Sequence, residues 1–230
     1  MSFLGRLMHD PLYQPGEARA ADEVAAREPE IIVSPDTRRA NRIPPGQSRT
    51  RKWPVLDAHG TPNVDLATWE LSVEGLVASP LSWSLDEFMQ LPTAHVYADF
   101  HCVTRWSRLD NIWSGVATRT IAELCGLDPA AKFVSALAYD NAWTTNLPIE
   151  YFLNEDALIA WAHDGQPIPP EHGGPVRLIV PQLYAWKSAK WLHGLTFLAA
   201  DQAGFWENGG YHMRGNPWNG TDGERYRWQS

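Results

Sequence analysis

The chain has few cysteines, no excess of basic residues and no long apolar run. Cys102 and Cys125 are its only two cysteines, too few for a disulfide framework, so we expect both thiols to be reduced. Acidic residues outnumber basic ones by 27 to 19, and the formal net charge is −8. General nucleic-acid binding needs a basic footprint and is therefore excluded. No segment approaches the roughly 18 continuous apolar residues of a membrane span.

The N-terminal segment also lacks the apolar core that a secretory signal needs. Arg38 and Arg39 form a pair like that of a twin-arginine signal, but no apolar stretch follows them. Reduced thiols are typical of an intracellular compartment, so these absences predict a cytoplasmic protein. We also expect a monomer.

The composition predicts one large folded domain preceded by an arm. With 230 residues, of which 44% are hydrophobic, the chain can bury a sizeable core. Residues 1–40 are rich in charge, proline and alanine, which predicts a partly irregular N-terminal arm. Residues 41–230 form the predicted domain.

Alternation of apolar and polar residues locates the strands. Residues 68–76 and 94–100 alternate clearly and predict half-buried strands, and we expect further strands over 132–139, 176–180 and 191–199.

Capping signals locate the helices. A capping box at 84–87 predicts a helix that ends near Pro92, and a second box at 120–123 predicts a helix that ends at Gly126. Asn154 is expected to cap a third helix that runs to about His163. Short helices placed irregularly between strands favour an α+β fold over a doubly wound sheet.

Twelve tryptophans are unusually many for a chain of this length. Packing in the core and loops is the simplest interpretation, because aromatic side chains dominate core energetics. A deep pocket walled by indoles and a carbohydrate-stacking surface are the alternatives.

Cys102 is the first candidate functional residue. It lies at the end of the predicted strand 94–100, after His101 and before Trp106, with Arg105 and Arg108 close in sequence. Nearby cations favour the thiolate, the form of cysteine that binds metals and attacks electrophiles. The setting predicts a metal ligand or a nucleophile, and a buried inert cysteine is the alternative.

Two further segments carry cations. His172 precedes a glycine pair, which lets a backbone approach a ligand, and Arg177 follows with a fork of donors suited to phosphate. Downstream, Lys187 and Lys190 bracket Ser188 in a plausible phosphate cradle, although the glycine pattern of a P-loop is missing. The alternatives are a turn with a solvated arginine and an amphipathic surface segment.

Two other chemistries fit less well. A zinc site does not match because the possible ligands have none of the usual local spacings; these are His101, Cys102, Cys125, His172 and His193. A cysteine hydrolase would pair Cys102 with a distant histidine, but no oxyanion hole is marked in the sequence.

Taken in order from Asn41 to His212, these segments resemble the molybdopterin-binding domain of the sulfite oxidase family. The resemblance is to its small stand-alone bacterial members, which are related to the methionine sulfoxide reductase catalytic subunit. It is carried by the segments WELSVEG at 69–75, HCVTRWS at 101–107, GGPVRLIVP at 173–181 and KSAK at 187–190.

The resemblance implies a molybdenum–molybdopterin (Mo-MPT) cofactor held by named residues. Cys102 would ligate molybdenum beside the dithiolene of the pterin. The other residues that the resemblance assigns to the cofactor are Asn41, His101, His172, Arg177, Lys187, Ser188, Ala189 and Lys190. The family's polar contact from 134–139 falls here on Ala138 or Tyr139, which departs from the family pattern.

The implied activity is that of an oxidoreductase. It would transfer an oxygen atom to or from a small S- or N-oxo substrate, with two electrons exchanged with an external carrier, because the chain carries no haem-binding segment. Arg105 is absent from the methionine sulfoxide reductase relatives, so we predict that it selects an anionic substrate, with Arg108 as a second candidate. Alternatively, Arg105 contacts the cofactor or solvent.

The sequence leaves two alternative functions open. One is a non-catalytic protein on the same fold that binds the cofactor or a small anion. The other is a tryptophan-rich carbohydrate-binding module, which leaves the cysteine and the cations unexplained.

Overall fold

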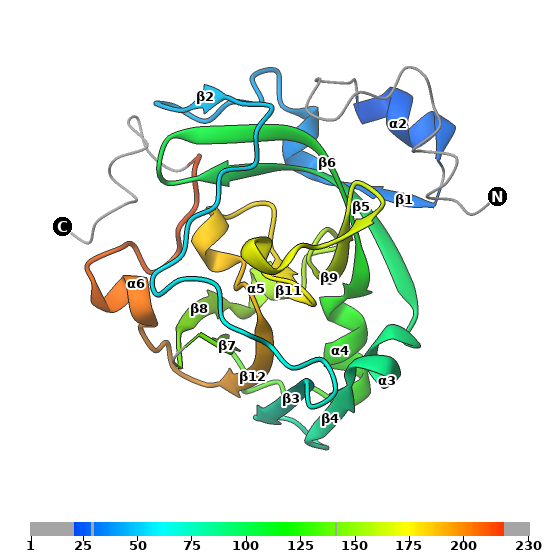
Figure 1. Ribbon diagram of the computed structural model, residues 1–230, viewed down its shortest axis with the longest axis vertical. Helices are drawn as coiled ribbons and strands as arrows, with labels where there is room; N and C mark the ends of the chain where they lie inside the picture. Colours follow the sequence, from blue (N-terminus) through cyan, green and yellow to red (C-terminus); the bar gives the residue numbers. More distant parts are fainter. Residues whose placement is uncertain (1–20, 29, 141, 219–230) are drawn as a thin grey trace.

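The computed structural model describes residues 21–28, 30–140 and 142–218 (Figure 1). Two mixed β-sheets with short helices around them confirm the predicted α+β class. In the view of Figure 1 the second sheet lies below the first.

The first sheet has the strand order β1-β5-β6-β9-β10, with β11 also paired to β9 and β2 to β6. Both β1 and β2 join it in parallel, and its other pairings are antiparallel. Its strands are β1 (Ile31–Val33), β2 (Ser48–Arg49), β5 (Thr93–Cys102), β6 (Trp106–Ala117), β9 (Leu158–His163), β10 (Gln166–Pro167) and β11 (Arg177–Ile179).

The second sheet has the order β4-β3-β12-β7-β8, in which β3 and β12 are parallel. Its strands are β3 (Glu70–Gly75), β4 (Leu81–Ser84), β7 (Phe133–Ala138), β8 (Thr144–Pro148) and β12 (Leu192–Leu198). Strands predicted over 68–76, 94–100, 132–139, 176–180 and 191–199 are thereby confirmed.

The helices are short and lie between strands. They are α2 (Ala21–Arg27), α3 (Leu85–Met89), α4 (Thr118–Cys125), α5 (Ile149–Phe152) and α6 (Phe205–Asn208), with 3-10 turns η1 (Pro35–Arg38), η2 (Pro170–His172) and η3 (Ala185–Lys187). No helix among the described residues is long and apolar enough to cross a membrane.

The main core lies where the two sheets face each other. Val116 and Ile159 of the first sheet pack in one cluster with Leu71, Val134 and Leu195 of the second. Burying these side chains supplies the principal driving force for folding.

Two capping predictions have different outcomes. At α3 the capping box is present: the Ser84 hydroxyl accepts from the Glu87 amide, and the Glu87 carboxylate accepts from the Ser84 amide. The helix α4 ends at a left-handed Gly126 as predicted, but it begins at Thr118 and has no side-chain cap. The predicted box at 120–123 is therefore wrong for the start of that helix.

The helix predicted from Asn154 to His163 is wrong, because residues 158–163 form β9. This strand pairs with β6 on one side and with β10 and β11 on the other, so it is buried and lacks alternation. Asp164 and Gly165, both with positive φ, form the two-residue turn of the β9–β10 hairpin. That Asp-Gly pair is the hairpin signal that the helical interpretation overlooked.

Residues 50–69 connect β2 to β3 without any helix or strand, and we call this segment the strap. Figure 1 shows it in cyan, crossing the front of the molecule from the first sheet to the second. Of the predicted N-terminal arm, residues 1–20 lie outside the described part. Within the remainder, β1 pairs with β5, with Ile31 opposite His95.

Candidate active site

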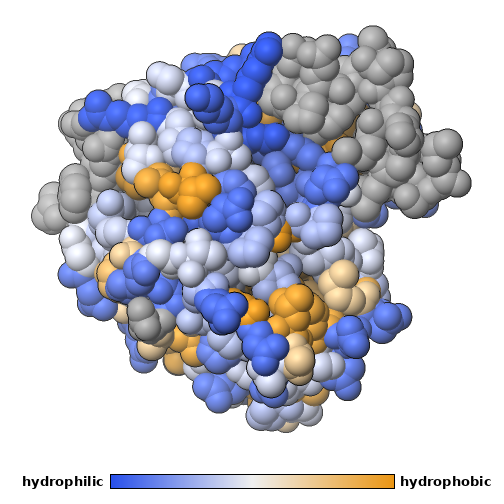
Figure 2. Space-filling view, in the orientation of Figure 1, coloured by the Kyte–Doolittle hydropathy of each residue, from blue (hydrophilic) through white to orange (hydrophobic). Residues whose placement is uncertain are grey.

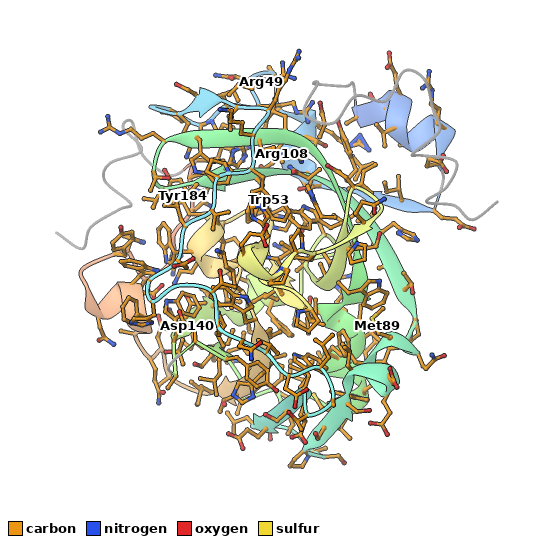
Figure 3. The ribbon with its side chains drawn as sticks, in the orientation of Figure 1. Arg49, Trp53, Met89, Arg108, Asp140 and Tyr184 are labelled. Carbon is orange, nitrogen blue, oxygen red and sulfur yellow. The ribbon has the colours of Figure 1, made fainter. Side chains whose placement is uncertain are left out.

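A cavity lies beneath the strap, between the end of β5 and the segments that flank β11. Its volume is about 190 Å³, and it opens to solvent at its mouth. Trp53 and Asp140, both labelled in Figure 3, belong to its lining and lie well apart in that view.

Cys102 points into the cavity because successive side chains of a strand point to opposite faces of the sheet. In β5, Phe100 and Cys102 face the cavity, whereas Asp99 and His101 face the opposite side of the sheet. Cys102 is only 7% exposed, and its Sγ accepts a hydrogen bond from the Thr104 hydroxyl at 3.2 Å. Burial raises the pKa of the Cys102 thiol above its ordinary value, and hydrogen bonding from Thr104 offsets only part of that rise.

Arg177, at the start of β11, brings a buried positive charge to the same cavity. It is 2% exposed, and it donates from Nη1 to the His172 carbonyl at 2.6 Å and from Nη2 to the Ser188 carbonyl at 2.8 Å. Its Nε finds no partner among the described residues. Burial lowers the pKa of Arg177 to about 9, and the nearby Cys102 raises it.

Lys190 supplies a second cation. Its Nζ donates to the Glu171 carbonyl at 2.8 Å, and burial followed by the charge of Arg177 lowers its pKa to about 8. In the described part of the chain, neither Lys190 nor Arg177 forms an ion pair with a carboxylate. Because a buried charge is normally paired, Arg177 predicts an anionic ligand in this cavity, and half-buried Lys190 adds positive charge beside it.

His172 completes this end of the cavity. Burial, followed by the charges of Arg177 and Lys190, lowers its pKa to about 4, so the ring is neutral at pH 7. Its Nδ1 has no partner among the described residues. Gly173 follows with φ of +103°, and a Cβ there would lie 2.8 Å from the Lys190 Cβ, so glycine allows the two segments to meet.

The remaining wall is aromatic. Six of the twelve tryptophans line the cavity, as in the alternative of an indole-walled pocket, and others such as Trp69 and Trp113 pack in the core as the simplest interpretation expects. The lining tryptophans are Trp53, Trp106, Trp143, Trp186, Trp191 and Trp206.

Part of the predicted site is therefore assembled and part is not. The predicted residues that line the cavity are Cys102, His172, Arg177, Ser188 and Lys190. Those absent from the lining are Asn41, His101, Arg105, Lys187 and Ala189. For the second group the assignment to cofactor or substrate stays a prediction that the geometry does not support.

Each residue of that second group has another role in the fold. The Asn41 side chain accepts from the Ile43 amide at 3.0 Å in an exposed turn, and the Ala189 carbonyl accepts from the Leu178 amide at 2.9 Å. The His101 Nδ1 lies 2.9 Å from the Ser107 hydroxyl, behind the sheet.

Lys187 and the two candidate arginines also lie elsewhere. The Lys187 ammonium is fully buried against Glu207 at 2.5 Å and Asn146 at 2.8 Å. Arg105 is exposed, at the last position of the tight turn formed by residues 103–105. Arg108 is buried and pairs with Asp164 at 2.7 Å, so it is not available to a substrate.

Several lining residues were not predicted. Thr104, Asp57 and Asp140 contribute polar groups, and Trp53 and Leu56 come from the strap. Nothing local marks the strap, since only tertiary structure brings it over the cavity.

At the position where the family has a polar contact, Ala138 lines the wall. Tyr139 turns away, and its hydroxyl accepts from the Glu70 amide at 2.9 Å.

The donor set fits a molybdenum–pterin cofactor. The described residues contain no cluster of three or more His, Cys, Asp or Glu side chains able to hold a metal, and both cysteines are free. A metal bound at Cys102 therefore needs its other ligands from a cofactor, as a dithiolene would provide. Arg177 and Lys190 offer the cations that an anionic pterin phosphate requires, and the Nε of Arg177 and the Nδ1 of His172 are available to it.

Comparisons with known proteins agree with this site. The profile of the "oxidoreductase molybdopterin binding domain" family matches residues 58–206. The chain is 46% identical over 190 residues to the uncharacterized oxidoreductase YuiH of Bacillus subtilis, covering 82% of this chain and 94% of that protein. It is 31% identical to the putative protein-methionine-sulfoxide reductase subunit YedZ1 of Azospira oryzae, covering 75% and 66%.

A solved structure shares the fold. The crystal structure of the sulfane dehydrogenase SoxCD from Paracoccus pantotrophus superposes with a TM-score of 0.56 at 21% identity, over 61% of this chain and 41% of that one. The profile match and the extent of the likeness to YuiH confirm the resemblance to sulfite oxidase-type domains. The chain belongs to the oxidoreductase molybdopterin-binding domain family, and it is an oxidoreductase.

Proposed function

We propose that this oxidoreductase binds Mo-MPT through Cys102 and transfers an oxygen atom to or from a small S-oxo compound. In the reducing direction, an S-oxide, two protons and two electrons give the thioether and water. The oxidising direction is the reverse, with water as the oxygen source. When bound, the cofactor supplies the two-electron exchange and the oxygen-atom chemistry.

One observation carries the proposal: the buried Cys102 thiol shares a cavity with buried Arg177 and half-buried Lys190, and in the described part of the chain neither cation forms an ion pair with a carboxylate. Cys102 provides the soft ligand that molybdenum requires of the protein. Arg177 and Lys190 together favour an anion at the same place. A cavity that only bound a neutral metabolite would gain nothing from holding these charges.

The residues of the cavity bind and orient the ligand, and they keep water out. Arg177 is held by the carbonyls of His172 and Ser188, so its charge is fixed before any ligand arrives. Neutral His172 can donate or accept a hydrogen bond without adding charge. Trp53 and the other indoles close the walls, and a water-poor cavity strengthens each electrostatic contact inside it.

The apolar wall favours an organic S-oxide as substrate. Trp143, Trp186, Trp206 and Tyr211 belong to the lining, whereas Arg105 lies outside it. A sulfoxide with apolar substituents gains from burial against these rings, whereas a small inorganic anion does not. The name of YedZ1, a putative protein-methionine-sulfoxide reductase subunit, supports the same substrate class.

We also propose that the protein exchanges electrons with an external carrier, lies in the cytoplasm and is a monomer. Cell fractionation of the native host tests the location, and light scattering of the purified protein tests the monomer. An enzyme recovered outside the cytoplasm or as a stable dimer would contradict the corresponding proposal.

The test of the function is metal and pterin content together with turnover. We expect about one molybdenum and one pterin per chain after expression with molybdate, and turnover of organic sulfoxides with a reduced dye. Cys102→Ser should lose turnover and molybdenum coordination, whereas Cys125→Ala, which removes the other buried thiol, should keep both.

Two outcomes would contradict the proposal. Protein from a competent host that holds neither metal nor pterin would contradict cofactor binding. Bound cofactor without turnover of any S-oxide would instead favour the non-catalytic binding protein.

A further inference from the structure

The loop that follows Cys102 is a tight hairpin connection. Cys102, at the end of β5, pairs with Trp106, at the start of β6, so three residues join the strands. The Arg105 amide donates to the Cys102 carbonyl at 3.0 Å, and Arg105 has φ of +74°. This is the geometry of a three-residue hairpin loop whose last position is left-handed. The loop therefore holds residues 103–105 in one defined arrangement.

Within this loop Thr104 is turned back onto the sulfur of Cys102. Its hydroxyl donates to Sγ at 3.2 Å, and the side chain and backbone of Thr104 both lower the pKa of the Cys102 thiol. Thr104 also lines the cavity, and its side chain is exposed at the mouth. The neighbouring Val103 anchors the loop by packing against Tyr184 and Trp186.

Arg177 and Lys190, the cations of the cavity, do not donate hydrogen bonds to the Cys102 sulfur. Two donors of Arg177 are engaged with the carbonyls of His172 and Ser188, and the Lys190 ammonium donates to the Glu171 carbonyl. Both act on the sulfur through charge at a distance. In the described part of the structure, the hydrogen bond that reaches Sγ comes from the Thr104 hydroxyl.

We propose that Thr104 is a positioning residue for Cys102, orienting its sulfur into the cavity and withdrawing electron density from it. The proposal rests on the function proposed above, in which Cys102 ligates molybdenum. Hydrogen bonds to a ligating sulfur orient the ligand and tune the metal. Thr104 thereby sets both the direction of Sγ and how strongly the sulfur donates to the metal.

The experiment compares Thr104→Val, which keeps the shape and loses the hydroxyl, with Thr104→Ser, which keeps the hydroxyl. Because Thr104 is exposed, neither variant removes buried packing. Thr93→Val is the matched control, since Thr93 is an exposed threonine at the other end of the same strand.

The first readout needs no cofactor. Labelling the cysteine Cβ with ¹³C gives signals from Cys102 and Cys125, and Cys125 is an internal reference buried in the main core. In the apoprotein we expect the Cys102 signal to shift or broaden beyond its linewidth in Thr104→Val only. A Cys102 signal identical in all four proteins would overturn the positioning role.

The second readout uses the loaded enzyme. The sulfur-to-molybdenum charge-transfer band and the Mo(V) EPR signal should shift in Thr104→Val and return in Thr104→Ser. We expect kcat to fall about tenfold with KM unchanged, the effect of losing one hydrogen bond. Unshifted spectra in a fully loaded Thr104→Val enzyme would overturn the tuning role and leave the proposed function intact. Absence of molybdenum from the parent protein would overturn the function itself, while the ¹³C readout would still test the hydrogen bond.

Discussion

Trp53 of the strap lies flat on His172, with ring centroids 3.8 Å apart and ring planes 8° from parallel. The Trp53 ring also contacts the His163 ring, with centroids 4.3 Å apart and planes tilted by 51°. A residue of an irregular segment thus holds the imidazole that stands beside Arg177 and Lys190. The contact joins the strap to the cationic end of the cavity, and it makes the strap part of the binding wall.

Removing the Trp53 ring should therefore loosen cofactor binding. We expect Trp53→Ala to retain less pterin per chain and to lose about 2 kcal/mol of stability, because Trp53 is only half-buried. Trp53→Phe keeps a ring for stacking and should retain most of both. Pterin fluorescence after oxidation and urea unfolding provide the measurements. Full pterin content in Trp53→Ala would show that the strap does not hold the site.

Lys187 and Lys190 should respond differently to replacement. The buried Lys187–Glu207 pair ties η3 to α6, and removing one partner of such a pair costs about 3–5 kcal/mol. Lys187→Met should thus be strongly destabilised but bind pterin normally once folded. Lys190→Met should lose pterin with little change in stability. If Lys187→Met lost pterin as completely as Lys190→Met, the predicted cofactor role of Lys187 would be restored.

A compensating change provides the control for that prediction. Adding Glu207→Gln to Lys187→Met removes the carboxylate that would otherwise remain buried without its ammonium partner. We expect the double variant to recover part of the lost stability in urea unfolding. No recovery would mean that packing, and not the charge, accounts for the loss.

Arg105→Ala tests whether substrate choice depends on an anion-selecting arginine. Because the Arg105 side chain is exposed and lies outside the cavity lining, we expect small and equal losses in kcat/KM for sulfite and for a neutral sulfoxide. A selective loss for sulfite would support the sequence-based prediction that Arg105 faces the substrate. Steady-state kinetics with both substrates on the loaded enzyme provide the comparison.

Three histidines with lowered pKa values make stability sensitive to acid. Burial lowers the pKa values of His101 and His163 to about 3 and that of His172 to about 4. A histidine with a depressed folded pKa supports the fold above its unfolded value near 6.5, and the support is lost as pH falls toward the folded value. For His101 alone the loss by pH 5 is about 2 kcal/mol.

Urea unfolding at pH 7 and at pH 5 measures this loss. His101→Gln should unfold with a smaller difference between the two pH values than the parent protein. His193→Gln, which removes an imidazole nearer the surface, controls for the substitution itself. An unchanged pH difference in His101→Gln would contradict the prediction, whatever its effect at pH 7.

Local patterns located five of the twelve described strands and part of the site. Alternation over 94–100 placed Cys102 at a strand end, and the glycine pair before Arg177 indicated a close backbone approach. Both signals are local because they depend on the side-chain period of a strand and on backbone freedom at glycine. The same reasoning failed at 154–163, where a strand buried on both sides has no alternation to distinguish it from a helix.

The sequence by itself determined the α+β class, the family resemblance and the two strands at which Cys102 and Arg177 lie. Only the tertiary structure decided which neighbours share their cavity: it directs Lys187 to Glu207, turns Arg105 outward and lays Trp53 over His172. Whether a cation faces a ligand or a buried carboxylate depends on contacts between segments far apart in the chain. Spacing within one segment cannot encode that choice, because burial and pairing are properties of the packed molecule.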